Sequence, residues 1–309
     1  MPWVSAVVIL VDKNSDGIKV NMYDFDKLVQ ETIINSNKLK EYFRMNLIYH
    51  QLVTGKGLEF DKIKEYYMGA DPKRIDWKKF AKSGDLMVRM FKEERHFDII
   101  IVLDVSDTML LGTTDVTKNE YAALIAGIFA TAAIEASDNV AVVMHSDKVE
   151  VYTDPGSELS SMMVLVADKA NYGGGKEWNK LTQSLVLNYR PESIVFLISD
   201  FLDTDADGFI PELASYFSKV YGIMVRDPVD NTLPQGVGRM YVKDVTGKSV
   251  YLADLNRLRE AYQTQVLIDI TKLRDVFRQY NQLFFQIIPG EDFGREFIKS
   301  LGGEEVIIT

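Results

Sequence analysis

The sequence predicts an α/β protein with a doubly wound, mostly parallel sheet, helices on both faces and a smaller mixed extension at the N-terminus. Three observations support this prediction. Short apolar runs rich in β-branched residues recur from residue 97 onward, and segments with helical periodicity separate most of them. Strands that are apolar on both faces are typical of a parallel sheet covered by helices on both sides. The composition, 47% hydrophobic and 26% charged, is that of an ordinary globular protein.

Residues 1–54 are expected to form a strand–helix extension. Residues 3–11 (WVSAVVILV) predict a core strand, and apolar side chains in residues 22–53 recur at roughly helical spacing until Gly55 ends the pattern. The apolar run is too short to cross a bilayer, no basic residue precedes it, and no small-residue cleavage site follows it. We therefore expect no membrane span and a cytoplasmic location.

Residues 55–96 are expected to form a basic arm that packs on the main domain. This segment has 11 lysines and arginines against 8 acidic residues, a surplus of 11 − 8 = 3 positive charges, in a chain whose net charge is −10. It has little periodicity apart from residues 86–91 (LMVRMF), whose composition is typical of a strand.

The main domain, residues 97–309, contains five apolar strand candidates. They are residues 97–103, 139–144, 193–199, 219–225 and 283–288, and the helical segments are 117–136, 176–188, 207–218 and 255–281. Alternating residues in 148–152 (KVEVY) predict an antiparallel edge strand. Asp104 ends the first strand of this domain, so we expect it near the point where strand order reverses, which is where such sheets bind ligands.

The composition and motifs exclude several classes of function. The absence of cysteine removes thiol nucleophiles, disulfides and iron–sulfur sites, and the net charge of −10 disfavours nucleic-acid binding. Residues 171–178 (NYGGGKEW) do not form a phosphate-binding loop, because Ala170 and Glu177 stand where Gly and Ser or Thr are required. We expect no nucleotide site, and glycines that let this loop pass close to the top of the sheet.

A cluster of oxygen-bearing side chains follows the first strand of the main domain. The stretch IVLDVSDTM (101–109) supplies the carboxylate of Asp104 and the hydroxyls of Ser106 and Thr108. A second apolar run, SIVFLISD (193–200), ends in Asp200, which joins the cluster if the two strands are neighbours. Oxygen ligands of this kind suit a hard divalent cation, Mg²⁺ or Mn²⁺. The alternative is a turn with helix-capping residues.

A further acidic stretch, DTDADG (203–208), supplies Asp203, Asp205 and Asp207. It matches the opening of a calcium-binding loop, but Ala214 stands at the twelfth position, where a bidentate Glu is required. A turn with capping aspartates is therefore the favoured interpretation, and weak calcium binding is the alternative.

Two stretches together resemble a known family. Residues 55–94 (GKGLEFDKIKEYYMGADPKRIDWKKFAKSGDLMVRMFKEE), followed by IVLDVSDTM, closely resemble the signature of domain-of-unknown-function family fifty-eight, and ISDFLD (198–203) and VRDPVDNTLP (225–234) are later matches. Members carry a von Willebrand factor A-like domain and are often encoded beside MoxR-type AAA+ ATPases. The resemblance covers about residues 55–300.

The resemblance implies a metal-ion-dependent adhesion site at Asp104, Ser106, Thr108 and Asp200, with one coordination position left for an acidic residue of a partner protein. It thus implies binding without turnover, with a MoxR-type AAA+ ATPase or its client as partner. In the signature segment we expect Arg74, Asp76 and Trp77 to lock the arm onto the sheet domain through a salt bridge and a buried indole.

The sequence departs from the family pattern at the metal-binding positions. Thr108 replaces the usual Ser but keeps a hydroxyl, whereas Gly175 and Lys176 stand where a further Thr ligand is usual. Ala70 and Met68 also replace an Asp and a Pro of the signature. Three hypotheses follow: a metal-bridged adaptor, a metal-dependent hydrolase that uses the strand-end carboxylates, and a metal-free interaction module in which Lys176 takes the place of the cation.

Overall fold

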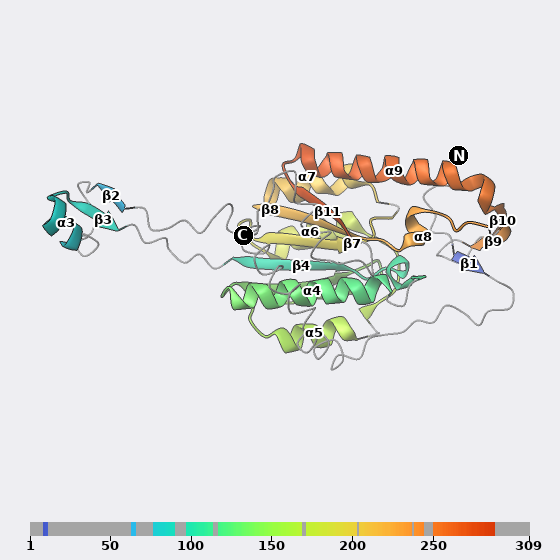
Figure 1. Ribbon diagram of the computed structural model, residues 1–309. Helices are drawn as coiled ribbons and strands as arrows, with labels where there is room; N and C mark the ends of the chain where they lie inside the picture. Colours follow the sequence, from blue (N-terminus) through green and yellow to red (C-terminus); the bar gives the residue numbers. More distant parts are fainter. Residues whose placement is uncertain are drawn as a thin grey trace, which may run out of the picture. The chain divides into compact units, whose positions relative to one another are not determined.

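The structure is a computed structural model of residues 1–309 (Figure 1). It describes residues 9–11, 63–65, 77–89, 97–113, 117–168, 171–202, 204–236, 238–243 and 250–287. The chain divides into two compact units: residues 1–49 with 97–309, and residues 50–96.

The larger unit is built on a six-stranded sheet in the order β11-β8-β7-β4-β5-β6. The strands are β4 (Asp98–Asp104), β5 (Asn139–His145), β6 (Glu150–Tyr152), β7 (Ile194–Ser199), β8 (Lys219–Val225) and β11 (Leu283–Ile287). All neighbouring pairs are parallel except β5 and β6, which are antiparallel at one edge. The prediction of an α/β domain with a mostly parallel sheet and an antiparallel edge strand is confirmed.

The central strands are apolar because both faces of the sheet are covered. Ile101 pairs with Val142 on β5 and with Phe196 on β7, and all three side chains are buried. Alternation with polar residues is absent from these strands since neither face meets water. The edge strand β6 has no fully buried residue and keeps the alternating pattern that the sequence showed.

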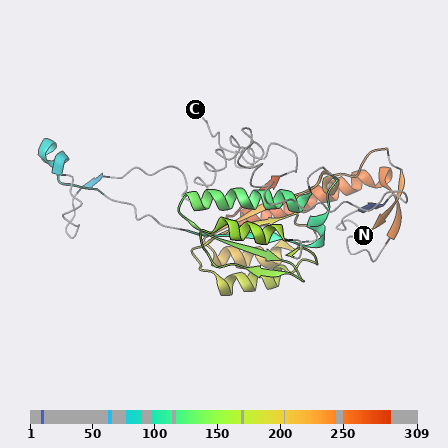
Figure 2. The same ribbon diagram turned by 90° about the horizontal axis from the view of Figure 1, so that it is seen from below.

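Helices cover both faces of this sheet (Figures 1 and 2). One face carries α4 (Lys118–Glu135) and α5 (Leu159–Ala167), and the other carries α6 (Trp178–Asn188), α7 (Ala206–Tyr216) and α9 (Leu255–Gln279). The α4 helix is rich in alanine and buried on most sides, and the ring of its Phe129 lies 4.6 Å from that of Phe196. No helix that the structure describes is both long and apolar enough to span a membrane.

A second, three-stranded antiparallel sheet has the order β1-β9-β10. It consists of β1 (Ile9–Val11), β9 (Arg239–Lys243) and β10 (Val250–Asp254). The strand predicted at residues 3–11 therefore contributes its last three residues to this small sheet and not to the six-stranded one. The helix predicted within residues 22–53 lies outside the described residues.

In the smaller unit, β2 (Ile63–Glu65) and β3 (Met87–Arg89) form an antiparallel pair, and α3 spans Trp77–Ser83. The strand-like composition of residues 86–91 thus corresponds to β3. The role of this segment as an arm packed on residues 97–309 stays a prediction.

We expect Gly222→Ala to destabilise the fold. Gly222 lies on β8 between Leu197 and Phe284, and a Cβ atom there would fall 2.5 Å from Phe277 and 2.8 Å from Phe284. Overpacking of this kind costs about 1–3 kcal/mol, measured by denaturant unfolding. Gly208→Ala in α7 is the matched control, since its Cβ would meet nothing closer than 3.5 Å, and it should leave stability unchanged or slightly raised. Equal effects of the two substitutions would contradict this packing.

Candidate functional site

The candidate site lies at the edge of the sheet where β4 and β7 end. The chain leaves β4 for β5 on one side and later returns to place β7 on the other side, so strand order reverses between β4 and β7. These strands are parallel neighbours, which brings Asp104 and Asp200 to the same edge. Ligands of doubly wound sheets bind at this position.

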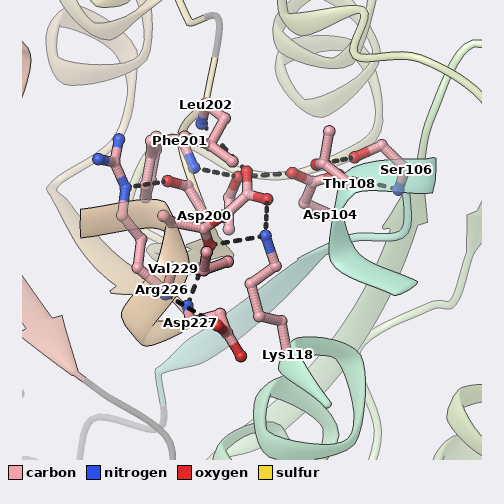
Figure 3. Close-up of polar contacts among 12 residues, drawn as sticks. Asp104, Ser106, Thr108, Lys118, Asp200, Phe201, Leu202, Arg226, Asp227 and Val229 are labelled. Atoms are coloured by element: carbon pink, nitrogen blue, oxygen red, sulfur yellow. Dashed lines mark hydrogen bonds and ion pairs between the residues drawn. The ribbon is translucent and has the colours of Figure 1, made fainter. Parts of the chain in front are cut away.

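The loop after β4 arranges Asp104, Ser106 and Thr108 as one hydrogen-bonded group (Figure 3). The Asp104 carboxylate accepts hydrogen bonds from the Ser106 backbone N–H at 2.9 Å and from the Ser199 hydroxyl at 2.5 Å. The Ser106 and Thr108 hydroxyls lie 3.1 Å apart. A short 3₁₀ helix, η2 (Asp107–Leu110), begins directly after Ser106 and fixes the position of Thr108.

The Lys176 ammonium lies among the predicted metal ligands. Its Nζ atom is 2.9 Å from Asp200 Oδ1 and 3.6 Å from Asp104 Oδ2, and it donates a hydrogen bond to Thr108 Oγ1 at 2.7 Å. Only 9% of the Lys176 side chain is exposed. The structure therefore brings Asp104, Thr108, Asp200 and Lys176 together, and the ammonium contacts three of the predicted metal ligands.

A second lysine, which sequence reasoning missed, binds the other carboxylate oxygen of Asp200. Lys118 is fully buried at the start of α4, and its Nζ atom lies 2.8 Å from Asp200 Oδ2 and 2.9 Å from Asp230 Oδ2 (Figure 3). A capping box formed by Thr117 and Glu120 fixes the start of α4. Asp200 thus binds one ammonium with each of its two oxygens.

The two ammonium groups set the charge states of the cluster. Burial alone would raise the pKa of Asp200, but the charges of Lys118 and Lys176 outweigh it and hold this pKa far below the usual range. Burial would likewise lower the pKa of each lysine, yet the neighbouring carboxylates raise both. Burial, together with the Asp200 charge, raises the pKa of Asp230 against the opposing effect of Lys118. These shifts favour the charged forms of Asp200, Lys118 and Lys176 at neutral pH.

The loop after β8 contacts the cluster at Lys118, through Asp230. Asp227 caps the short helix α8 (Pro228–Asn231), accepts a hydrogen bond from the Thr113 backbone at 2.6 Å, and donates its own N–H to Asp230 at 3.0 Å. Arg226 donates from Nε to the Asp200 carbonyl oxygen at 2.9 Å. The segment VRDPVDNTLP therefore orients the buried carboxylate of Asp230 toward Lys118.

The loop that contains Gly173, Gly174 and Gly175, called the glycine loop here, positions Lys176. The backbone N–H groups of Gly174 and Gly175 donate to the carboxylates of Asp107 at 3.0 Å and Asp147 at 2.6 Å, respectively. Gly174 has φ of +95°, and a Cβ atom there would fall 2.1 Å from Asp147 Oδ1. After the loop, the Trp178 ring stacks on that of Phe209 at 4.7 Å. As predicted, the glycines let this loop pass close to the neighbouring turns at the top of the sheet.

The His145 side chain also supports the loop. Its Nε2 atom lies 3.1 Å from the Glu177 carbonyl oxygen, and its Nδ1 atom lies 3.3 Å from the Tyr152 hydroxyl. The neutral imidazole suits both contacts, because Nε2–H then donates to the carbonyl and Nδ1 accepts from the hydroxyl. Burial lowers the pKa of His145 and favours this neutral form.

The other predicted residues do not join this cluster. Asp205 and Asp207 are exposed at the start of α7 and line a separate cavity, while Asp203 lies outside the described residues. Arg74 and Asp76 also lie outside the described residues, and Trp77 begins α3, with its side chain not described. The salt bridge and buried indole expected there stay predictions.

Comparison with known proteins gives the family. A family model described as "Protein of unknown function DUF58" matches residues 62–270, more than half of the chain. The chain belongs to the DUF58 family. No curated protein matches this sequence.

Two solved structures resemble this DUF58 protein. One is a conserved hypothetical protein, BatB, from Bacteroides thetaiotaomicron, with 14% identity, a TM-score of 0.44, and coverage of 67% of this chain and 98% of that chain. The other is an aerotolerance-related membrane protein from Bacteroides fragilis NCTC 9343 carrying multiple mutations to serine, with 14% identity, a TM-score of 0.45, and coverage of 67% and 99%.

We call the group formed by Asp104, Thr108, Lys176 and Asp200 the cup. The oxygen atoms of the cup do not suit a divalent cation. Both oxygens of Asp200 and the hydroxyl of Thr108 already bind ammonium groups, and Asp104 accepts from Ser106 and Ser199. The described residues contain no group of three or more His, Cys, Asp and Glu side chains arranged to hold a metal. A Mg²⁺ or Mn²⁺ ion would have to displace Lys176, and its binding stays a prediction.

We expect Lys118→Met to destabilise the protein strongly. The substitution keeps the length and apolar stem of the side chain but leaves the buried carboxylates of Asp200 and Asp230 without this ammonium. Breaking a buried ion pair in this way costs about 3–5 kcal/mol in the free energy of unfolding, measured by denaturant titration. Lys180→Met is the control, because Lys180 pairs with Glu150 on the surface and its loss should change little. A small effect of Lys118→Met would show that the buried network does not hold the fold.

We expect the free energy of unfolding to decrease as the pH falls below about 6.5, because of His145. Its folded pKa is lowered from the usual value, so the unfolded chain binds the proton more readily. The contribution is fully present above the unfolded pKa and is lost as the pH falls toward the folded pKa. In His145→Gln the side-chain amide still donates to Glu177 but does not titrate, so stability should depend less on pH in this window. Identical pH profiles from thermal unfolding of the two proteins would contradict the assignment.

Proposed function

We propose that this DUF58 protein is a non-enzymatic protein-interaction module whose binding site is held together by lysine instead of a divalent cation. The observation that carries the proposal is the Lys176 ammonium, which contacts Asp104, Thr108 and Asp200 at the centre of the cup. Two carboxylates brought to one sheet edge repel each other and need a compensating positive charge. Lys176 supplies that charge from within the chain.

A lysine differs from a bound metal in a way that bears on function. The ammonium is covalently part of the chain, and its position is fixed by the glycine loop between Asp107 and Asp147. The loops after β4, β5 and β7 are thereby tied together at every magnesium concentration. Partner binding at this face should then require no divalent cation and should weaken with salt if the partner is charged.

The same contacts argue against the hydrolase alternative. A two-ion mechanism needs carboxylate oxygens that are free to bind metal, whereas both oxygens of Asp200 hold ammonium groups. His145, the nearest candidate base, faces the Glu177 carbonyl and the Tyr152 hydroxyl and pairs with no nucleophile. Binding is therefore favoured over turnover.

The partner in this proposal is a MoxR-type AAA+ ATPase or its client protein, which the family resemblance implies. The test is direct binding of the purified chain to the MoxR-type ATPase of the same organism, measured in magnesium and in EDTA. Equal affinity in both buffers is expected. Binding that is lost in EDTA and restored by magnesium would contradict the lysine-based site, and phosphoester hydrolysis that depends on Asp200 would contradict the non-enzymatic role.

We expect Lys176→Thr to gain magnesium affinity. The substitution removes the ammonium from Asp104 and Asp200 and adds a hydroxyl oxygen at the same loop position, which completes a set of oxygen ligands. Isothermal titration should show no magnesium binding to the natural chain and measurable binding to the variant. Lys180→Thr, an exposed lysine on α6, is the control and should bind no magnesium. Unaltered magnesium affinity in Lys176→Thr would count against the replacement of the cation by lysine.

A further inference from the structure

A cavity of about 480 Å³ lies beside the cup, lined by the segment after β7, the start of α7 and one side of α9. Its apolar wall is made of Phe201, Leu202, Val266, Leu273 and Val276. All five of these side chains are buried in the body of the protein. The volume falls within the range of about 300–1,000 Å³ that is usual for small-molecule sites.

Arg226 is the most buried charged residue in the lining of this cavity, with 3% of its surface exposed. Its Nε atom donates to the Asp200 carbonyl oxygen, and in Figure 3 its two terminal nitrogens point away from the cup. Among the described residues, the one side-chain hydrogen bond of Arg226 is made by Nε, and none is made by these terminal nitrogens. A guanidinium stays charged, so an anion in the cavity would supply an opposite charge that the described residues do not place against these nitrogens. A carboxylate matches the paired geometry of its terminal nitrogens.

The rest of the polar lining has the opposite charge. Asp205 and Asp207 are exposed, Asp269 is half-buried, and Lys272 is the one other cation of the lining. Three carboxylates near the solvent side repel a simple anion and attract a cationic group. The lining therefore presents a positive group at its buried part, an apolar wall, and a mainly negative outer part.

We propose that this cavity binds a small zwitterionic molecule whose carboxylate and cationic group are separated by an apolar body. The carboxylate pairs with the terminal nitrogens of Arg226, the apolar body lies against Leu202, Val266 and Leu273, and the cationic group reaches Asp269 and its acidic neighbours. This site uses none of the side chains that form the lysine cup, so it does not depend on the proposed protein-binding role.

The test uses 6-aminohexanoate as the probe and follows its binding to the full chain by NMR titration. Hexanoate and hexylamine, which each lack one of the two charges, are the matched probes. We expect 6-aminohexanoate to bind more tightly than either. Arg226→Gln should weaken its binding about tenfold or more, because a hydrogen-bonded charge pair is lost. Arg274→Gln, an exposed arginine on α9 that does not line the cavity, should leave binding unchanged.

A second variant keeps the test decisive if Arg226→Gln does not fold. Asp269→Asn should weaken the binding of 6-aminohexanoate several-fold but leave hexanoate binding unchanged or stronger. Equal binding of the three probes to the natural chain, or 6-aminohexanoate binding that survives both substitutions, would overturn the proposal. Tight binding of a blocked peptide with one lysine and one glutamate, without binding of the free zwitterion, would overturn the assignment to a small molecule.

Discussion

The Asp200 carboxylate binds two ammonium groups. The edge of the sheet where β4 and β7 end depends on this interaction. One oxygen binds Lys118 at the start of α4, and the other binds Lys176 after the glycine loop. Asp230, on α8, binds the same Lys118. Four segments that are distant in sequence are thus tied together through the buried charge of Asp200. The cost of removing this charge from water is offset because each side chain in the network has an oppositely charged partner within hydrogen-bond distance.

This network explains why the loops around it take such specific conformations. Gly174 adopts a positive φ that favours glycine and passes close to the Asp147 carboxylate, and this path of the loop brings Lys176 to Asp104 and Asp200. His145 supports the same loop from β5, and Trp178 anchors it where α6 begins. In the proposed function, Lys176 supplies the positive charge that a bound ion would otherwise supply to Asp104 and Asp200.

The cup and the neighbouring cavity are joined through a single peptide segment. Asp200 directs its side chain to the lysines and its carbonyl oxygen to Arg226, and the next residues, Phe201 and Leu202, form part of the cavity wall. A buried guanidinium, the buried ammonium of Lys118, the largely buried ammonium of Lys176 and four buried aspartates lie within this small region; the aspartates are Asp104, Asp200, Asp227 and Asp230. Such a concentration of buried charge is costly, which is the physical reason for assigning function to this edge of the sheet.

The sequence by itself determined the strands of the six-stranded sheet, the class of that sheet and the strand-end positions of Asp104 and Asp200. Apolar runs such as residues 97–103 and 193–199 are long enough to identify a sheet buried on both faces. Lys176 was indicated by the family resemblance, because Gly175 and Lys176 stand where a further Thr ligand is usual. The sequence did not reveal β9 and β10, whose short strands carry no clear alternation, nor the contribution of residues 9–11 to their sheet. Only the tertiary structure placed Lys118, Asp230 and Arg226, because a lysine or arginine reads as a surface residue until the order of the strands shows which distant carboxylates or carbonyl oxygens it meets.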